Sequence, residues 1–382
     1  MVLTTSRARR LLALTLLGTA GIALPAAAQA ATITVPATGD TQSIQNAVDA
    51  ASPGDAIRVS PGTYTGPTVN VEKDGITIRG PKAAVINAAG HTFGITVGHQ
   101  EADGSVNPDP SCGTAAPVYQ VRNFTLDGLT IRDADFTGIF MMGVDGFRVT
   151  GGRYVDNDEY AIFPRCSRDG LIDKNFGSGG EDALIYVGVD DNVRVEGNHV
   201  TGAVIGIELE NTQNSFVRGN LVTGNVAGIF VIVLPGLPTD STDHALIENN
   251  VVNKNNLPNP FPQVCDENGQ PPGCGPLEDD LQLLPSGTGI LNVGGHDVTI
   301  RGNVANQNDT VGIGAAFNPI VGVSSLGTIV TGNVALQNGL SPDPRTQGAG
   351  DLLFLDDPTN GSCFTDNIHK TEDFPFGPPL CL

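Results

Sequence analysis

Short runs of alternating hydrophobic and polar residues recur at a nearly constant interval between residues 137 and 232. Asn175, Asn198 and Asn220 mark this interval, with spacings of 23 and 22 residues. Each repeat contains two or three such runs, rich in Val, Ile, Leu and Phe and separated by Gly, Asn and Asp. A constant period of this length is typical of a solenoid. Because no run is long enough for an amphipathic helix, the pattern predicts that the repeats consist of strands.

Strands of successive repeats are expected to stack in parallel, about 4.8 Å apart, so that the inward residues of neighbouring coils bury each other. The recurring asparagines then form a column at one turn, where side-chain amides bond along the stack. We favour this structural role over a catalytic one. The column comprises Asn175, Asn198, Asn220, Asn250, Asn303, Asn333 and Asn367.

The segment from residue 32 to 64 departs from the repeat, because it reads as strand, turn, helix and strand. Ile44, Val48 and Ala51 lie on one face of the expected helix. A stack of strands has an open apolar end, and an amphipathic helix is a common cover for it. We therefore expect a short N-terminal capping helix.

Two segments carry a resemblance to a known superfamily. SIQNAVDAASPGDAIRVSPGTY (residues 43–64), followed by Gly-Asn repeats, resembles the cap and first coil of the secreted right-handed parallel β-helix proteins of the pectate-lyase-like superfamily. Residues 185–238 are similar to bacterial parallel β-helix repeat proteins. The resemblance implies an all-β, single-stranded, right-handed parallel β-helix, in line with the usual handedness of parallel connections. It implies no particular activity, since the superfamily includes lyases, hydrolases, epimerases and non-enzymatic members.

The first thirty residues indicate export. Arg7, Arg9 and Arg10 precede an apolar run over residues 11–24, and Ala28-Gln29-Ala30 fits a cleavage site, so we expect a signal peptide cleaved near Ala30. Sec export is favoured over twin-arginine export because the twin-arginine motif is incomplete. No later run is long enough to span a bilayer. We expect a secreted, extracellular monomer.

Residues 31–382 are expected to form one β-helix domain. Its expected parts are the cap (31–64), coils (65–340) with insertions near 98–117, 233–243 and 257–286, and a closing segment (341–382). Long insertions in a compact fold are usually functional or disordered loops.

Charge and cysteine content narrow the choice of partners and compartment. Without the signal peptide the chain has 17 basic and 41 acidic residues, a formal charge of −24. Nucleic acid is therefore not expected as a partner, and a polyanionic sugar would need a cation or a basic patch.

Six cysteines in an exported chain suggest disulfides, with 15 possible pairings. We expect the local pairs Cys265–Cys274 and Cys363–Cys381, which leaves Cys112–Cys166.

Two columns of outward-facing residues follow if one hydrophobic position per repeat, such as Ile207, faces inward. With Leu184 as the inward residue of its repeat, the first column is Phe140, Phe163, Ile185, Glu208, Phe230, Leu291 and Gly314. The second is Met142, Arg165, Val187, Glu210, Ile232, Val293 and Ala316. An apolar outward face of this kind is expected to be covered by the insertions or by a ligand.

Glu208 and Glu210 stand out because they are carboxylates within this apolar face. Their Cα atoms are expected to lie about 6.5 Å apart, a separation at which paired acids can act on a glycosidic bond. Apolar surroundings should raise their pKa values, as a general acid or base requires. Arg165 lies two repeats away and could act as a charge clamp or proton acceptor. The alternative is structural: a loop covers the face, and Arg165 and backbone amides satisfy both glutamates.

A second candidate site is a calcium site formed by Glu181, Asp182, Asp190 and Asp191, at neighbouring turns of one repeat. Carboxylate oxygens suit Ca²⁺, and the superfamily resemblance allows it, although such acids are more often solvated turn residues. The histidines show no zinc-like spacing.

Two function classes remain open. The first is an enzyme that binds or acts on polysaccharide, a lyase, epimerase or hydrolase of uronate-containing or other glycans, with Glu208, Glu210 and Arg165 in catalytic roles. The second is a non-catalytic extracellular binding or structural module with an apolar docking face.

Overall fold

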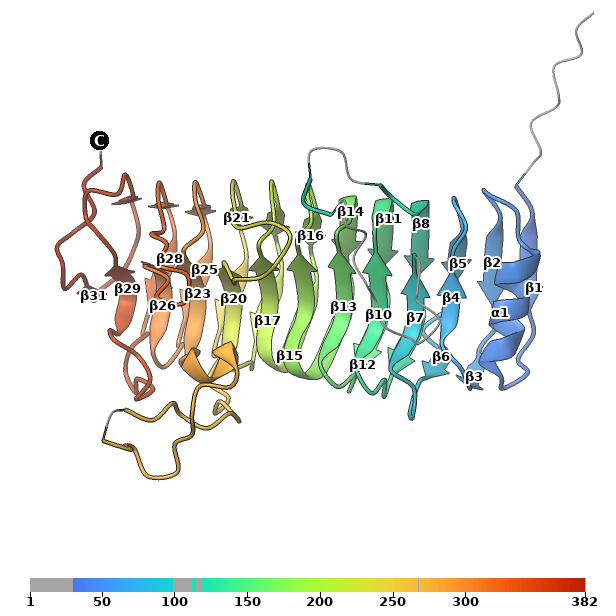
Figure 1. Ribbon diagram of the computed structural model, residues 1–382, viewed down its shortest axis with the longest axis horizontal. Helices are drawn as coiled ribbons and strands as arrows, with labels where there is room; N and C mark the ends of the chain where they lie inside the picture. Colours follow the sequence, from blue (N-terminus) through green and yellow to red (C-terminus); the bar gives the residue numbers. More distant parts are fainter. Residues whose placement is uncertain (1–29, 99–111, 115–117, 267, 382) are drawn as a thin grey trace, which may run out of the picture.

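The computed structural model describes residues 30–98, 112–114, 118–266 and 268–381. These residues wind into one elongated coil, with successive turns side by side along its long axis (Figure 1). Every pairing between named strands is parallel, as the repeat period predicts. Of the expected signal peptide, residues 1–30, all but Ala30 lie outside the described residues.

Three stacks of parallel strands form the walls of the coil. The first contains β1 (Thr32–Val35), β2 (Ala56–Val59), β5 (Thr77–Arg79), β8 (Val121–Asp127), β11 (Val144–Thr150), β14 (Arg168–Asp173), β16 (Arg194–Glu196), β18 (Phe216–Arg218), β21 (Leu246–Glu248), β24 (Thr299–Arg301), β27 (Ile329–Thr331) and β30 (Cys363–Thr365). The second contains β3 (Gly62–Thr65), β6 (Ala84–Asn87), β9 (Thr130–Arg132), β12 (Arg153–Val155), β15 (Phe176–Gly188), β17 (His199–Glu210), β19 (Leu221–Thr223), β22 (Val251–Asn253), β25 (Val304–Asn306) and β28 (Val334–Leu336).

The third stack carries the candidate site. It contains β4 (Val69–Val71), β7 (Phe93–Val97), β10 (Thr137–Met142), β13 (Tyr160–Arg165), β20 (Ala227–Ile232), β23 (Thr288–Val293), β26 (Val311–Ala316), β29 (Gly350–Leu355) and β31 (Glu372–Asp373). The long strands β15 and β17 bend from the second stack into the third, which joins the two into one sheet.

The core is the inside of the coil. Ile207 pairs with Ile229 on the next turn, and both are fully buried within the interior cluster. The expected asparagine column from Asn175 to Asn367 is confirmed. At each step the backbone N–H and side-chain amide of one asparagine donate to the side-chain oxygen of the next. A second column, absent from the sequence analysis, runs from Asn225 to Asp351 at another turn.

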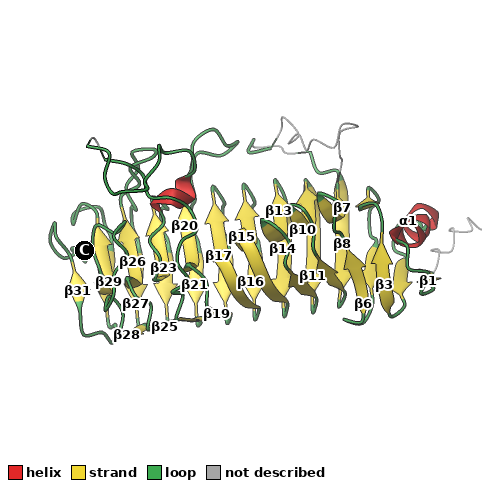
Figure 2. Cartoon of the chain, turned by 90° about the horizontal axis from the view of Figure 1, so that it is seen from below, coloured by secondary structure: helices red, strands yellow, loops and turns green. Residues whose placement is uncertain are grey.

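Both ends of the coil are covered. The helix α1 (Thr41–Ala50) lies beside the first strands and buries Ile44 and Val48 (Figure 2). Its N-terminus is capped by the Asp40 side chain, which accepts from the backbone of Gln42. At the far end Phe354 packs edge-on against two further phenylalanines of the closing segment.

All three expected disulfides are confirmed, namely Cys112–Cys166, Cys265–Cys274 and Cys363–Cys381. They are consistent with an oxidising, extracellular compartment. None of the helices in the described ranges is both long and apolar enough to cross a membrane.

One detail of the expected register is wrong. Ile185, and not Leu184, pairs with Ile207, because β15 contains an irregularity between Gly180 and Ala183. An extra residue in one strand turns every later side chain to the opposite face. The outward residues of this turn are therefore Tyr186 and Gly188 instead of Ile185 and Val187.

Candidate functional site

The outward face of the third stack is apolar and covered, as expected. Its aromatic rings form a continuous row in which the centroids of Phe140 and Phe163 lie 5.0 Å apart and those of Phe163 and Tyr186 4.4 Å apart. Further along the stack, the short 3-10 helix η1 (Asp280–Leu283) lies over β20 and β23 (Figure 2). Leu281 of η1 is buried in the same cluster as these rings. The insertion at 257–286 thus supplies the cover.

Glu208 and Glu210 lie on this outward face, confirming their orientation. Glu208 pairs with Phe230 and Glu210 with Ile232 on the following turn. They are only 3% and 6% exposed, and they lie on the face whose outer hydrophobic cluster includes Leu281 of η1. The Tyr186 hydroxyl donates to Glu210 Oε2 at 2.7 Å. Among the described residues, no hydrogen-bond donor faces the Glu208 carboxyl.

Asp182 and Asp280 complete a group of four carboxyls with Glu208 and Glu210, which we call the carboxyl cluster. The Tyr160 hydroxyl donates to Asp182 Oδ2 at 2.6 Å. The second oxygen of Asp182 is buried without a partner in the described part of the chain. Asp280, in η1, contributes negative charge to the surroundings of the other three.

The pKa values in the carboxyl cluster are raised, as the apolar face predicts. Burial raises the pKa of Glu210 to about 7, although the Tyr186 hydrogen bond and the Arg165 charge act in the opposite direction. Burial also raises the pKa of Asp182 to about 7, against the effect of its Tyr160 hydrogen bond. The pKa of Glu208 is raised well above its usual range by burial and then by its charged neighbours. Glu210 and Asp182, with pKa values of about 7, can therefore exchange protons near neutral pH.

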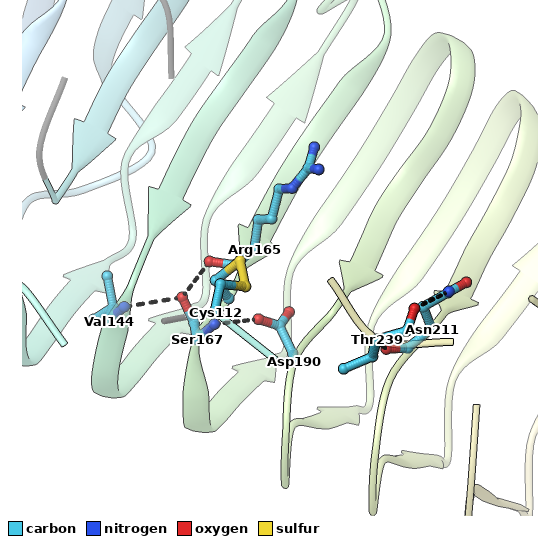
Figure 3. Close-up of a disulfide and its surroundings, with 8 residues drawn as sticks. Cys112, Val144, Arg165, Ser167, Asp190, Asn211 and Thr239 are labelled. Atoms are coloured by element: carbon cyan, nitrogen blue, oxygen red, sulfur yellow. Dashed lines mark hydrogen bonds between the residues drawn. A yellow bond between two sulfur atoms is a disulfide. The ribbon is translucent and has the colours of Figure 1, made fainter. Parts of the chain in front are cut away.

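Arg165 lies two turns from Glu210, as expected, since it pairs with Gly188, which in turn pairs with Glu210. It makes no ion pair with either glutamate in the described residues, so the structural alternative in which Arg165 satisfies both is wrong. Its Nε atom is buried and has no partner among the described residues. Figure 3 shows its side chain extending away from the adjacent Cys112–Cys166 disulfide. Within the described ranges Arg165 is therefore a cation without an ion-pair partner, and its charge acts on Glu210.

The four acids of the predicted calcium site are not brought together. Asp182 belongs to the carboxyl cluster, and Glu181 is exposed. Asp190 accepts from the backbone of Ser167 at 2.6 Å beside the disulfide (Figure 3), and Asp191 accepts from Asn214 at 2.8 Å. Within the described ranges, no group of three or more His, Cys, Asp or Glu side chains has a geometry that could hold a metal ion. The described structure does not support a calcium site formed by these four residues together, and calcium binding stays a prediction.

Tyr160, Tyr186 and Asp280 were missed by the sequence analysis. Tyr160 immediately precedes the repeat that contains Phe163, and the alternation of Ile185-Tyr186-Val187 is itself a signal that Tyr186 faces outward. Asp280 gives no such signal, because it belongs to an irregular insertion. It also borders a cavity of about 700 Å³ that extends from the carboxyl cluster toward the last coils.

Comparisons with known proteins agree with this architecture. A family model described as right-handed β-helix region matches residues 105–252. The chain folds as a right-handed parallel β-helix. This β-helix resembles an alginate lyase from Paenibacillus sp. str. FPU-7, with 18% identity, a TM-score of 0.53, and coverage of 85% of this chain and 98% of that one. No curated protein matches it in sequence.

Two further solved structures share the β-helix. The A-module of a mannuronan C-5 epimerase from Azotobacter vinelandii is 14% identical, with a TM-score of 0.55 and coverage of 89% of this chain and 94% of that one. A tailspike protein of E. coli bacteriophage HK620, in complex with a pentasaccharide, is 13% identical, with a TM-score of 0.58 and coverage of 88% and 59%. At these identities the likeness concerns the fold.

Proposed function

We propose that this β-helix acts on a polysaccharide at the carboxyl cluster. The observation that carries the proposal is two tyrosine–carboxyl contacts, the part-buried Tyr160–Asp182 and the buried Tyr186–Glu210, beside the Glu208 carboxyl, which has no hydrogen-bond partner among the described residues. The alginate lyase, the epimerase and the pentasaccharide-bound tailspike of similar fold support a carbohydrate substrate.

Hydrolysis is the reaction that these side chains support best. It requires one protonated and one ionised carboxyl, and the cluster supplies both. The pKa of Glu208 is raised well above its usual range, mainly by burial, which suits a general acid. Glu210, with a pKa of about 7, is available as the base or nucleophile. A lyase or epimerase acting on uronates would also need cationic groups for the substrate carboxylates, and Arg165 is the candidate for that role. Because the glutamates are covered, the reaction requires η1 to move aside for the sugar.

The second candidate is a non-catalytic module. It is favoured by the cover itself, since Leu281 packs into the outer cluster and both glutamates are almost inaccessible. In that case the carboxyl cluster would remain protonated and buried, and the face would serve packing alone.

A polysaccharide panel separates these functions. Uronate-containing and neutral polymers would be incubated with the purified protein, with Ca²⁺ and with chelator, while new reducing ends and unsaturated uronates are measured separately. Hydrolysis predicts reducing ends without unsaturation, and at least about a hundredfold loss in Glu208→Gln and Glu210→Gln. Glu181→Gln, which changes an exposed acid on the neighbouring strand β15, serves as the control. Full activity in both glutamate variants would refute the catalytic proposal, and binding without turnover would support the module.

A further inference from the structure

The cavity of about 700 Å³ is a separate feature from the buried glutamates, neither of which lines it. Its floor is formed by outward side chains of β20, β23, β26 and β29, including Phe230, Leu291 and Leu353. Its walls come from η1 and from loops near Asn318, Arg345 and Asp357. Its volume lies within the range of about 300–1,000 Å³ that is usual for small-molecule sites.

The lining is mainly apolar, and part of it is left in contact with water. Leu283, Phe317, Ile320 and Phe376 all line the cavity and are among the exposed large hydrophobic residues of the described chain. Exposed apolar area around one hollow is unfavourable in water unless a ligand covers it. The apolar body of a ligand would bury this area.

Most charged groups in the lining are already satisfied by the protein. Arg345 pairs with Asp343 at 3.0 Å and donates to the backbone carbonyls of Phe261 and Gln282. Asp356 accepts from Ser324 and Ser325, and Asp357 from Thr359. These bonds hold Arg345 and Asp356 in the walls, whereas Asp357 is exposed and its two bonds from Thr359 both end on Oδ1.

Asp280 differs from them. Its carboxyl receives no hydrogen bond from any other described residue, although it is partly buried at the edge of the cavity. Asp182, Glu208 and Glu210 lie behind it and interact with it electrostatically. Asp280 therefore places a carboxyl that accepts no hydrogen bond from another described residue at the η1 side of an apolar cavity, with further acids close by. This side attracts a cation and repels an anion.

We infer that the cavity binds a small amphiphilic cation, in which an apolar ring or hydrocarbon body fills the hollow and a primary ammonium group pairs with Asp280. A charge-assisted hydrogen bond to a partly buried carboxylate is stronger than one between neutral groups, and gives the site its selectivity for the head group. This inference does not depend on the proposed action on polysaccharide.

Three probes with one apolar body test the inference: 1-naphthylmethylammonium, 1-naphthalenemethanol and 1-naphthoate. Isothermal titration calorimetry of the full chain, at fixed ionic strength and without polysaccharide, is expected to rank the ammonium first and the carboxylate last. The affinity for the ammonium should fall about tenfold or more in Asp280→Asn. Asp366→Asn, which removes one exposed charge outside the lining, should leave the ranking and affinity unchanged.

The apolar part of the site is tested by two further variants. Ala316→Phe inserts a ring from the cavity floor, and Phe376→Ser removes a lining residue that is 67% exposed, so that its folding should be unaffected. Both should weaken all three probes about equally. The inference is overturned if no probe binds, if the three head groups bind equally, or if the preference for ammonium survives in Asp280→Asn. It is also overturned if Phe376→Ser, folded by circular dichroism, binds all probes as tightly as the parent.

Discussion

Replacing Glu210 by Gln should change how the stability of the protein depends on pH. The carboxyl has its pKa raised from 4.5 to about 7, mainly by burial. Below pH 4.5 it is protonated in both the folded and unfolded states. Between pH 4.5 and about 7 only the unfolded state releases the proton, so the free energy of unfolding falls as pH rises. Above this window both states are ionised and the contribution is constant.

The magnitude follows from the size of the shift. A rise of about 2.5 pKa units corresponds to about 3 kcal/mol of stability that is present at low pH and lost by pH 8. Glutamine has nearly the same shape and can still accept from Tyr186, but it does not ionise. In Glu210→Gln the decline of stability between pH 4.5 and pH 8 should therefore be smaller by about 3 kcal/mol. Glu208 and Asp182 also have raised pKa values and, with Glu159, Asp190 and Asp280, contribute to the decline that remains.

Urea unfolding followed by circular dichroism at several pH values provides the measurement, after reversibility has been checked at each pH. Glu181→Gln is the matched control, because it changes an exposed acid on the strand that precedes Glu210 in the stack. Its stability profile should run parallel to that of the parent. A Glu210→Gln profile that also runs parallel to the parent would show that the carboxyl is not held protonated by its surroundings, and would refute the reasoning.

Three further changes have expected outcomes. Tyr186→Phe removes the hydroxyl that donates to Glu210 and should raise the pKa of that carboxyl further, so that the loss of stability extends to higher pH in the same unfolding series. Asn220→Ala leaves the buried backbone and side-chain amides of Asn198 without their acceptor. The free energy of unfolding, measured with urea, should fall by about 3 kcal/mol. A loss below about 0.5 kcal/mol would contradict the structural role of the column. Replacing both Cys112 and Cys166 by Ser removes the cross-link between residues 54 apart in the sequence. The free energy of unfolding should fall by up to about 4 kcal/mol, which lowers the thermal unfolding midpoint. An unchanged midpoint would show that the disulfide does not restrict the unfolded chain.

The sequence by itself determined the winding of the chain. The repeat period gave the pairing of Ile207 with Ile229 and the asparagine column, because both depend on residues at equivalent positions of successive turns. Alternation within one strand was sufficient to place Glu208 and Glu210 outward, and their apolar neighbours were sufficient to predict raised pKa values. These are local properties, and a local pattern is enough to predict them.

The tertiary structure decided what surrounds the glutamates. The irregularity in β15 shifts the register by one residue and places Tyr186 against Glu210. This contact cannot be predicted by assuming a constant repeat period. The path of the 257–286 insertion brings η1 and Asp280 over the face, through contacts with residues far away in the sequence, among them Arg345. Irregular segments carry no repeat from which their position can be extrapolated. Their position depends on long-range packing, and so do the carboxyl cluster, the cover and the cavity.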